Sequence, residues 1–385
     1  MKKSKVALII AAILVGIGTV GAIGSGVVAV PTVINEVEDA RIKYKQNQGE
    51  EIYKSQDLIE NLDINSVGSG ISTVELKKSD DNFFKIKAYN SQFQNIEIDT
   101  KYDSEKKTLN LNTNLKSERR FLSGEGNFFK RLYDGLIYSV VYDGEISKIT
   151  VEVPKGINVS LNAEGHVSLI TEDASTLKDT LKYKSYSGYC DLPKVNNLKN
   201  INIQTNSYIS MDFKELINAE NVEIFADNID ISTNGLLSDY KDVKKLPSNV
   251  TLKGSSVKVK SYMPIGQNVN INTNNYFEIV TDIHDYNVSG KIEMKNPEHY
   301  NDYDDYDDYN DYDDRDDRDD RDNRKNNYFN HCIKGLNIQA KDNKFEGQIS
   351  NGTIGKYNMN ITSNGGGRFE NITRESLETE LMMHR

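Results

Sequence analysis

The chain has 385 residues, of which 37% are hydrophobic, and its formal net charge is −11. Residues 301–325 hold 13 Asp against four Arg and one Lys, a local net charge of −8, which leaves −3 for the rest of the chain. No segment forms a strongly basic surface, so we exclude nucleic acid as a partner.

The N-terminal segment has the composition of a membrane-spanning helix. Lysines at positions 2, 3 and 5 precede 25 residues without a charge, Val6–Val30. About 20 helical residues cross the hydrocarbon core, whereas the apolar part of a cleavable signal peptide has only ~7–15 residues. The sequence therefore favours an uncleaved single-pass anchor over residues 1–32. The lysines place the N-terminus in the cytoplasm and the rest of the chain outside the cytoplasmic membrane.

Small residues recur on one face of this predicted helix. Gly18, Ala22 and Gly26 are four residues apart, a spacing that lets two membrane helices pack closely. This face is a candidate contact with a membrane-protein partner or with a second copy of the chain. The alternative is that the small residues only fill an apolar anchor. Residues 33–63 are charged and helical in character, and we expect a helical stalk or linker there.

From residue 64 onward, apolar and polar residues alternate in short runs. Examples are Val74–Leu76, Ile96–Ile98, Leu109–Leu111 and Ile149–Val153. A period of two is typical of half-buried strands. Ordinary antiparallel strands account for these early runs.

A longer period begins at residue 157. Pairs of short apolar runs recur, the first members starting at 159, 181, 201, 222, 250 and 269 and the second at 167, 189, 209, 229, 257 and 277. A repeat near 20 residues with two short strands is typical of a β-solenoid, whose stacked coils bury side chains that one coil cannot bury alone. The sequence therefore predicts an all-β fold, a parallel β-solenoid (β-helix), over residues 64–298. At its corners, Asn is expected to adopt left-handed conformations and to stack between coils. The alternative is an antiparallel β-sandwich with evenly spaced turns.

Residues 299–330 interrupt this pattern with a sequence of low complexity. Tyr recurs at every third residue from 300 to 312, and Arg continues the same step from 315 to 324, among acidic residues. A period of three fits neither a strand nor an α-helix, so we expect a disordered insert that bulges from one coil. Loose calcium binding is a weaker alternative, because the insert lacks the turn glycine usual in calcium loops.

Residues 331–385 resume the pattern. Leu336–Ile338 and Met359–Ile361 predict further strands of the stack. Leu377 and Leu381 follow Thr373, a suitable N-cap, so we expect a short terminal helix. The helix is expected to cover the open end of the stack, where strand edges would otherwise be unpaired.

Few residues in the sequence are candidates for catalysis or for binding a metal or a cofactor. The five histidines show no zinc-site spacing, and the chain has neither a Gly-x-Ser-x-Gly elbow nor a phosphate-binding glycine loop. Asp227, Asp230 and Asp282 are candidates for a polysaccharide-cleaving site, but Asp is also common at solenoid corners, and no arginine and histidine accompany them. We therefore predict no catalytic, metal-binding or cofactor-binding residues. Cys190 and Cys332 either form a disulfide outside the cell or are two unrelated thiols.

One stretch resembles a known family. It runs from Lys148 to Val159 with the sequence KITVEVPKGINV, and its continuation Ala163–Leu169 reads AEGHVSL. These segments are similar to the bacterial putative-adhesin domain of unknown function, which is related to the heads of auto-transporter adhesins. The resemblance covers residues 64–290 and 334–372. It implies a β-solenoid, frequently anchored by one N-terminal helix, and it brings no catalytic residues with it.

Our leading functional hypothesis is a membrane-anchored, extracytoplasmic, adhesin-like binding or structural protein without catalytic activity. It would contact a surface or envelope ligand through its exposed strand faces. One alternative is a regulatory ectodomain in an envelope-stress or signalling system. The other alternative is a polysaccharide-active β-helix enzyme.

Overall fold

The part of the chain that the computed structural model describes consists mostly of β-strands and has almost no helix, so the expected all-β class is confirmed. The predicted anchor, its Gly18/Ala22/Gly26 face and the insert, except Phe329, lie outside the described residues. Among the described residues, no helix has the length and apolar character to span a membrane. The described residues are 49–68, 71–89, 96–115, 148–193, 197–233, 245–295, 329, 332–336, 338 and 341–383.

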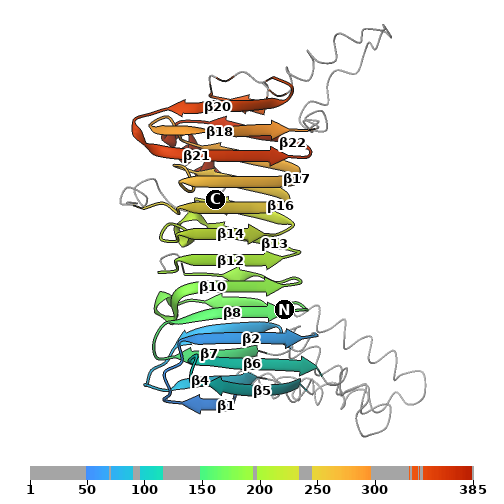
Figure 1. Ribbon diagram of the computed structural model, residues 1–385, viewed down its shortest axis with the longest axis vertical. Helices are drawn as coiled ribbons and strands as arrows, with labels where there is room; N and C mark the ends of the chain where they lie inside the picture. The colour runs from blue at the N-terminus through green and yellow to red at the C-terminus, as the bar shows by residue number, and fades with distance from the viewer. Residues whose placement is uncertain are drawn as a thin grey trace, which may run out of the picture.

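Most strands belong to two columns that follow the long axis of the molecule (Figure 1). The first column runs in the order β6 (Thr108–Leu115), β2 (Asn61–Val67), β8 (Ile157–Ala163), β10 (Leu177–Ser185), β12 (Asn200–Thr205), β14 (Asn221–Phe225), β16 (Asn249–Ser261), β17 (Asn268–Thr281), β21 (Ile354–Ser363) and β18 (Tyr286–Met294).

The second column has two stretches. The first stretch runs in the order β7 (Lys148–Val153), β3 (Thr73–Lys78), β9 (Ser168–Thr171) and β11 (Cys190–Asp191). The second stretch runs in the order β13 (Tyr208–Asp212), β15 (Asn228–Ser232), the later halves of β16 and β17, β22 (Gly366–Asn371) and β19 (Ile333–Lys334). Two short 3-10 helices, η2 (Ala174–Thr176) and η3 (Phe213–Glu215), lie in connecting segments. We call one strand of each column, with the segments that join them, a coil.

Neighbouring strands of a column are parallel and in register. In the first column Leu181 aligns with Val159 on one side and with Ile201 on the other. In the second column Ile229 aligns with Val257. The aligned residues are members of the repeated apolar runs, and all are buried. The same inward position therefore recurs from coil to coil and forms one narrow apolar interior.

The order of the coils departs from the order of the sequence at both ends of the stack. At one end, β2 lies between β6 and β8, and β3 lies between β7 and β9. At the other end, β21 and β22 lie directly against β17, and β18 lies beyond β21 (Figure 1). The coil of residues 354–371 is thus inserted between strands that precede it in the sequence.

Antiparallel strands finish the stack at both ends. β5 (Ile96–Asp103) pairs with β6, β4 (Phe84–Tyr89) pairs with β7, and β1 (Glu50–Ser55) pairs with β4. At the opposite end, β20 (Lys344–Asn351) pairs with β18. These strands satisfy hydrogen-bonding groups that the last parallel strands would leave open.

Two expectations for the N-terminal part are wrong. The described end of residues 33–63 is not a helical stalk, because β1 is a strand and Leu62 is a buried residue of β2. In addition, β3, β6 and β7 belong to the parallel stack, although β5 is antiparallel as expected. Leu62, Leu109 and Val159 occupy aligned positions but are 47 and 50 residues apart, so excursions of the chain conceal the repeat.

The second strand of one coil is also displaced from its predicted position. The repeat points to Tyr189 as the inward residue, but Cys190 aligns with Leu169 instead. Cys190 is buried, whereas Tyr189 is 52% exposed. The position predicted from the repeat is therefore wrong by one residue in this coil. A shift of one residue along a strand exchanges the side chains that point inward and outward.

The C-terminal strands and helix confirm part of the prediction. Met359–Ile361 lies in β21, but Leu336 and Ile338 lie outside any strand. The predicted terminal helix is α6 (Arg374–Met383), and the backbone N–H of Leu377 donates to the carbonyl oxygen of Thr373 at 3.0 Å. The helix packs against β17 inside the strand order and does not cover the end of the stack, where β20 lies.

Asparagines at the first position of successive strands form a ladder, as the sequence predicts. The side-chain amide of Asn221 donates to Asn200 at 2.9 Å, and that of Asn249 donates to Asn221 at 2.9 Å. Asn268 continues the ladder to Asn249 at 3.4 Å. The expected left-handed backbone is not found at these positions, because Asn343 is the one described asparagine with a positive φ.

Gly367 and Phe277 provide a test of the inserted coil. They align between β22 and β17, and a Cβ on Gly367 would lie 2.2 Å from the Phe277 ring. We expect Gly367→Ala to lower the free energy of unfolding by about 1–3 kcal/mol through overpacking. Combined with Phe277→Leu, the same change should cost less, and denaturant unfolding of the four proteins in a double-mutant cycle measures the difference. Additive effects would contradict the contact.

Candidate functional site

A shallow groove of about 780 Å³ crosses successive coils at the corner where the first column ends. Its lining residues come from the ends of β8, β10, β12 and β14 and from the middle of β16 and β17. Five coils each supply three consecutive residues, and a sixth supplies one. These are Asn162–Glu164, Lys184–Tyr186, Gln204–Asn206, Phe225–Asp227, Lys253–Ser255 and Asn274. We call this hollow the corner groove.

The floor of the corner groove is made by the middle residue of each triplet. These residues are small and occupy inward positions, and Ser185 aligns with Thr205 in the next coil. A Cβ on Gly254 would lie 2.3 Å from the carbonyl oxygen of Ala226, so this position requires glycine. The five floor residues are Ala163, Ser185, Thr205, Ala226 and Gly254.

The two walls of the corner groove carry outward-facing side chains with balanced charge. Lys184 and Lys253 lie on one wall, and Glu164 and Asp227 lie on the other. Tyr186 stands on the acidic wall with 64% of its surface exposed. The remaining wall residues are Asn162, Gln204 and Phe225 on the first wall and Asn206 and Ser255 on the second.

The charged groups on these walls have no partner within the described part of the chain. Neither Lys184 nor Lys253 forms an ion pair there, and the same holds for Glu164 and Asp227. The side-chain amides of Asn162, Gln204 and Asn206 likewise make no hydrogen bond to a described residue. The walls therefore present hydrogen-bonding capacity that a ligand can use.

The backbone at this corner is already hydrogen-bonded between coils. The N–H of Glu164 donates to the carbonyl of Ser66, and the N–H of Tyr186 donates to that of Gly165, each at 3.1 Å. The N–H of Asn206 donates to the carbonyl of Tyr186 at the same distance. A ligand therefore cannot join here as an added β-strand and must be recognised by side chains.

The opposite corner has a second groove of about 670 Å³, in which most of the charges are paired. Lys199 lies 2.8 Å from Asp179, and Lys245 lies 3.6 Å from Glu220. These pairs join neighbouring coils, so they stabilise the stack and offer less to a ligand than the corner groove does.

Glu60 extends this set of ion pairs along the stack. Its carboxylate lies 2.7 Å from Lys107, which precedes β6, and 3.1 Å from Lys178 in β10. Hydrogen bonds from Lys107 and then from Lys178 lower the pKa of Glu60 to about 2. One carboxylate thus connects three strands of the first column.

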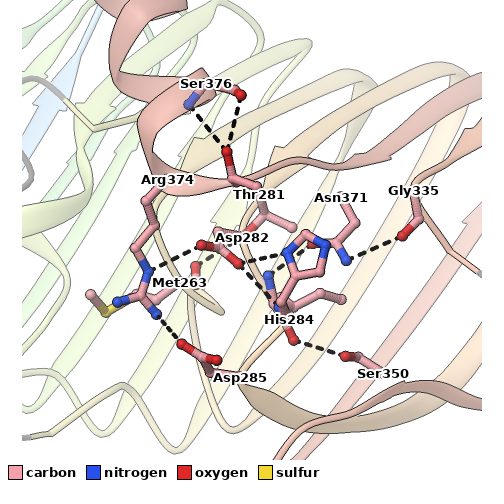
Figure 2. A network of polar contacts seen from close by, with 12 residues as sticks. Met263, Thr281, Asp282, His284, Asp285, Gly335, Ser350, Asn371, Arg374 and Ser376 are labelled. Carbon is pink, nitrogen blue, oxygen red and sulfur yellow. Dashed lines mark hydrogen bonds and ion pairs between the residues drawn. The ribbon is translucent and has the colours of Figure 1, made fainter.

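Asp282 lies in a separate polar cluster at the end of β17 (Figure 2). Its carboxylate accepts hydrogen bonds from the backbone N–H of His284 and from Nε of Arg374, each at 3.1 Å, and lies 3.0 Å from Nδ1 of His284. Arg374 also contacts Asp285 at 3.3 Å. Since Arg374 begins α6, the cluster attaches this helix to the turn after β17.

The structure does not assemble the three aspartates considered from the sequence. Asp227 lies in the corner groove, and Asp230 lies on β15, where it accepts hydrogen bonds from Tyr208 and Ser232. Asp282 has the arginine and the histidine that sequence reasoning missed. His284 could have been identified from the sequence, because it follows Asp282 by only two residues. Arg374 could not, because it is 92 residues from Asp282 and only the fold brings the two together.

In the described part of the chain, Cys190 and Cys332 are not joined by a disulfide. Cys190 is buried, which raises its thiol pKa, and Cys332 is half-buried just before β19. Their pairing in an oxidising compartment stays a prediction. Within the described ranges, no three His, Cys, Asp or Glu side chains cluster as a metal site would require.

Comparisons with known proteins find distant structural likeness. The chain is similar to a putative cell adhesion protein from Clostridium sporogenes, with 12% identity, a TM-score of 0.21, and coverage of 84% of this chain and 98% of the other. It is also similar to a putative adhesin from Bacteroides fragilis, with 12% identity, a TM-score of 0.23, and coverage of 84% and 97%. No protein-family model and no curated protein sequence matches the chain. At these scores the function must be argued from the chain's own residues.

Glu60→Gln should make the protein less sensitive to acid. The pKa of Glu60 is lower in the folded protein than its ordinary value of 4.5, so its contribution is complete above pH 4.5 and is lost as the pH falls towards 2. We expect the variant to be less stable at pH 7 and the difference from the wild type to shrink across this window. Denaturant unfolding of both proteins at a series of pH values from about 2 to about 7 measures this difference in the free energy of unfolding. A constant difference would contradict the assignment.

Arg374→Met should release α6. The change leaves the nearly buried carboxylate of Asp282 without its cation, at a cost of about 1–3 kcal/mol. We expect faster amide hydrogen exchange in α6 and little change in β8 or β10. Arg374→Lys, which keeps the charge but loses the two-pronged contact, should have an intermediate effect. Unchanged protection of α6 would show that other contacts hold the helix.

Proposed function

We propose that this protein is an adhesin-like binding module without catalytic activity, held outside the cytoplasmic membrane by its N-terminal segment. The corner groove is the observation that carries this proposal. Its walls hold unpaired charged and amide side chains, whereas the charges of the opposite corner are mostly engaged in ion pairs between coils. Unpaired hydrogen-bonding groups repeated along a groove suit a ligand that makes many similar contacts.

We propose a β-solenoid as the architecture that presents this groove. Parallel in-register pairing in both columns supports it over the antiparallel sandwich, in which parallel neighbours would not recur at every step. Strands fixed on both sides hold the wall residues in place before a ligand arrives. Preorganisation of this kind lowers the entropic cost of binding.

The mechanism that we propose is multivalent contact along the stack. Adjacent coils are about 4.8 Å apart, so aligned wall positions recur at short, regular intervals. A chain-like ligand that occupies several coils gains from each added contact without a further loss of translational freedom. A membrane anchor at residues 1–32 would hold the groove at the cell surface, a proposal that rests on the 25 uncharged residues from Val6 to Val30.

Cell attachment with matched lysine variants tests the proposal. Cells that display the full-length protein should attach to isolated envelope or matrix material, and Lys184→Gln/Lys253→Gln should reduce attachment about tenfold. The control is Lys182→Gln/Lys356→Gln, which removes two lysines that are also exposed but lie outside the groove. Equal attachment by both variants and by cells without the protein would contradict a binding role for the groove.

A further inference from the structure

We infer that the ligand of the corner groove is a neutral glycan chain; this inference rests on the proposed binding function. The first reason is charge. The two lysines of one wall are balanced by the two carboxylates of the other, and none of the four is paired within the described part of the chain. A polyanion would be repelled by Glu164 and Asp227, and a polycation would be repelled by Lys184 and Lys253.

The second reason is the chemistry of the uncharged wall residues. Asn162, Gln204 and Asn206 each supply both a donor and an acceptor, the combination that sugar hydroxyls require. Tyr186 adds an aromatic ring with 64% of its surface exposed, and Phe225 is half-buried beside the same hollow. An exposed ring can pack against the apolar C–H face of a pyranose, so the groove combines an aromatic surface with amide side chains.

The third reason is the repeat distance. Five coil intervals of about 4.8 Å give the groove a length of about 24 Å. A pyranose unit in an extended chain advances by about the same distance as one coil, so successive sugars can lie beside the wall residues of successive coils. An extended peptide of the same length matches the groove less well in chemistry, because its backbone would find the corner's N–H groups already engaged with neighbouring coils.

Calorimetric titration of the purified full-length protein tests this inference. The neutral probes are cellohexaose, chitohexaose, maltohexaose and mannohexaose. The acidic probes are a hexamer of galacturonic acid and a hyaluronate hexamer, and an uncharged glycine-serine-asparagine peptide of similar length serves as the peptide probe. We expect at least one neutral hexasaccharide to bind with an affinity that does not change between low and high salt.

Two tyrosine variants identify the surface that binds. Tyr186→Ala should weaken binding about tenfold. Tyr189→Ala should leave it unchanged, because Tyr189 belongs to the same coil and is also exposed, at 52%, but does not line the groove. Both positions lie on the surface, so we expect both variants to fold.

The outcomes separate this inference from the proposed function. Tighter, salt-sensitive binding of the acidic probes, or binding of the peptide alone, overturns the neutral glycan while a binding role for the groove stands. Binding of no hexasaccharide, together with cell attachment that still depends on Lys184 and Lys253, likewise overturns the neutral glycan alone. Equal loss in Tyr186→Ala and Tyr189→Ala overturns the assignment to the groove. Absence of both binding and attachment overturns the two proposals together.

Discussion

The parallel, in-register stacking of coils is the constraint on which the rest of this structure depends. Each strand finds its backbone partners in the coils beside it, and each inward side chain lies against its equivalent in the next coil, as Ile203 lies between Tyr183 and Ile224. An interior only one side chain deep suffices, because every coil shares it with two others. The terminal coils lack one such neighbour, and antiparallel strands supply it at both ends.

The same stacking converts a local sequence feature into a surface. Small residues recur at one position of the corner in aligned coils, as Ala163, Ser185 and Thr205, and all three line the corner groove. The residues on either side then form two continuous walls. The backbone of this corner is occupied by bonds between coils, so only side chains remain to determine what can bind.

Much of the central stack could be predicted from the sequence, because all but one of the steps between successive first runs from residue 159 to residue 269 are close to 20 residues. The ends could not, because the chain leaves the repeat between Leu62 and Leu109 and again between β18 and β21. Periodicity reveals that coils exist but not which of them are neighbours. The corner groove carried a readable pattern, a small residue recurring between polar ones, yet its unpaired charges became evident only from the folded arrangement. The partnership of Arg374 with Asp282 likewise depends on the fold.

Disulfide crosslinking tests the coil order most directly. Asn270 aligns with Asn360 in the inserted coil, and Lys291 lies beyond it. In a background with Cys190→Ala and Cys332→Ser, the pair Asn270→Cys/Asn360→Cys should oxidise readily, since adjacent parallel strands lie within the about 4.4–6.8 Å between Cα atoms that a disulfide spans. The pair Asn270→Cys/Lys291→Cys should not. Rapid bridging of positions 270 and 291, with none between 270 and 360, would contradict the inserted coil and the stacking order built on it.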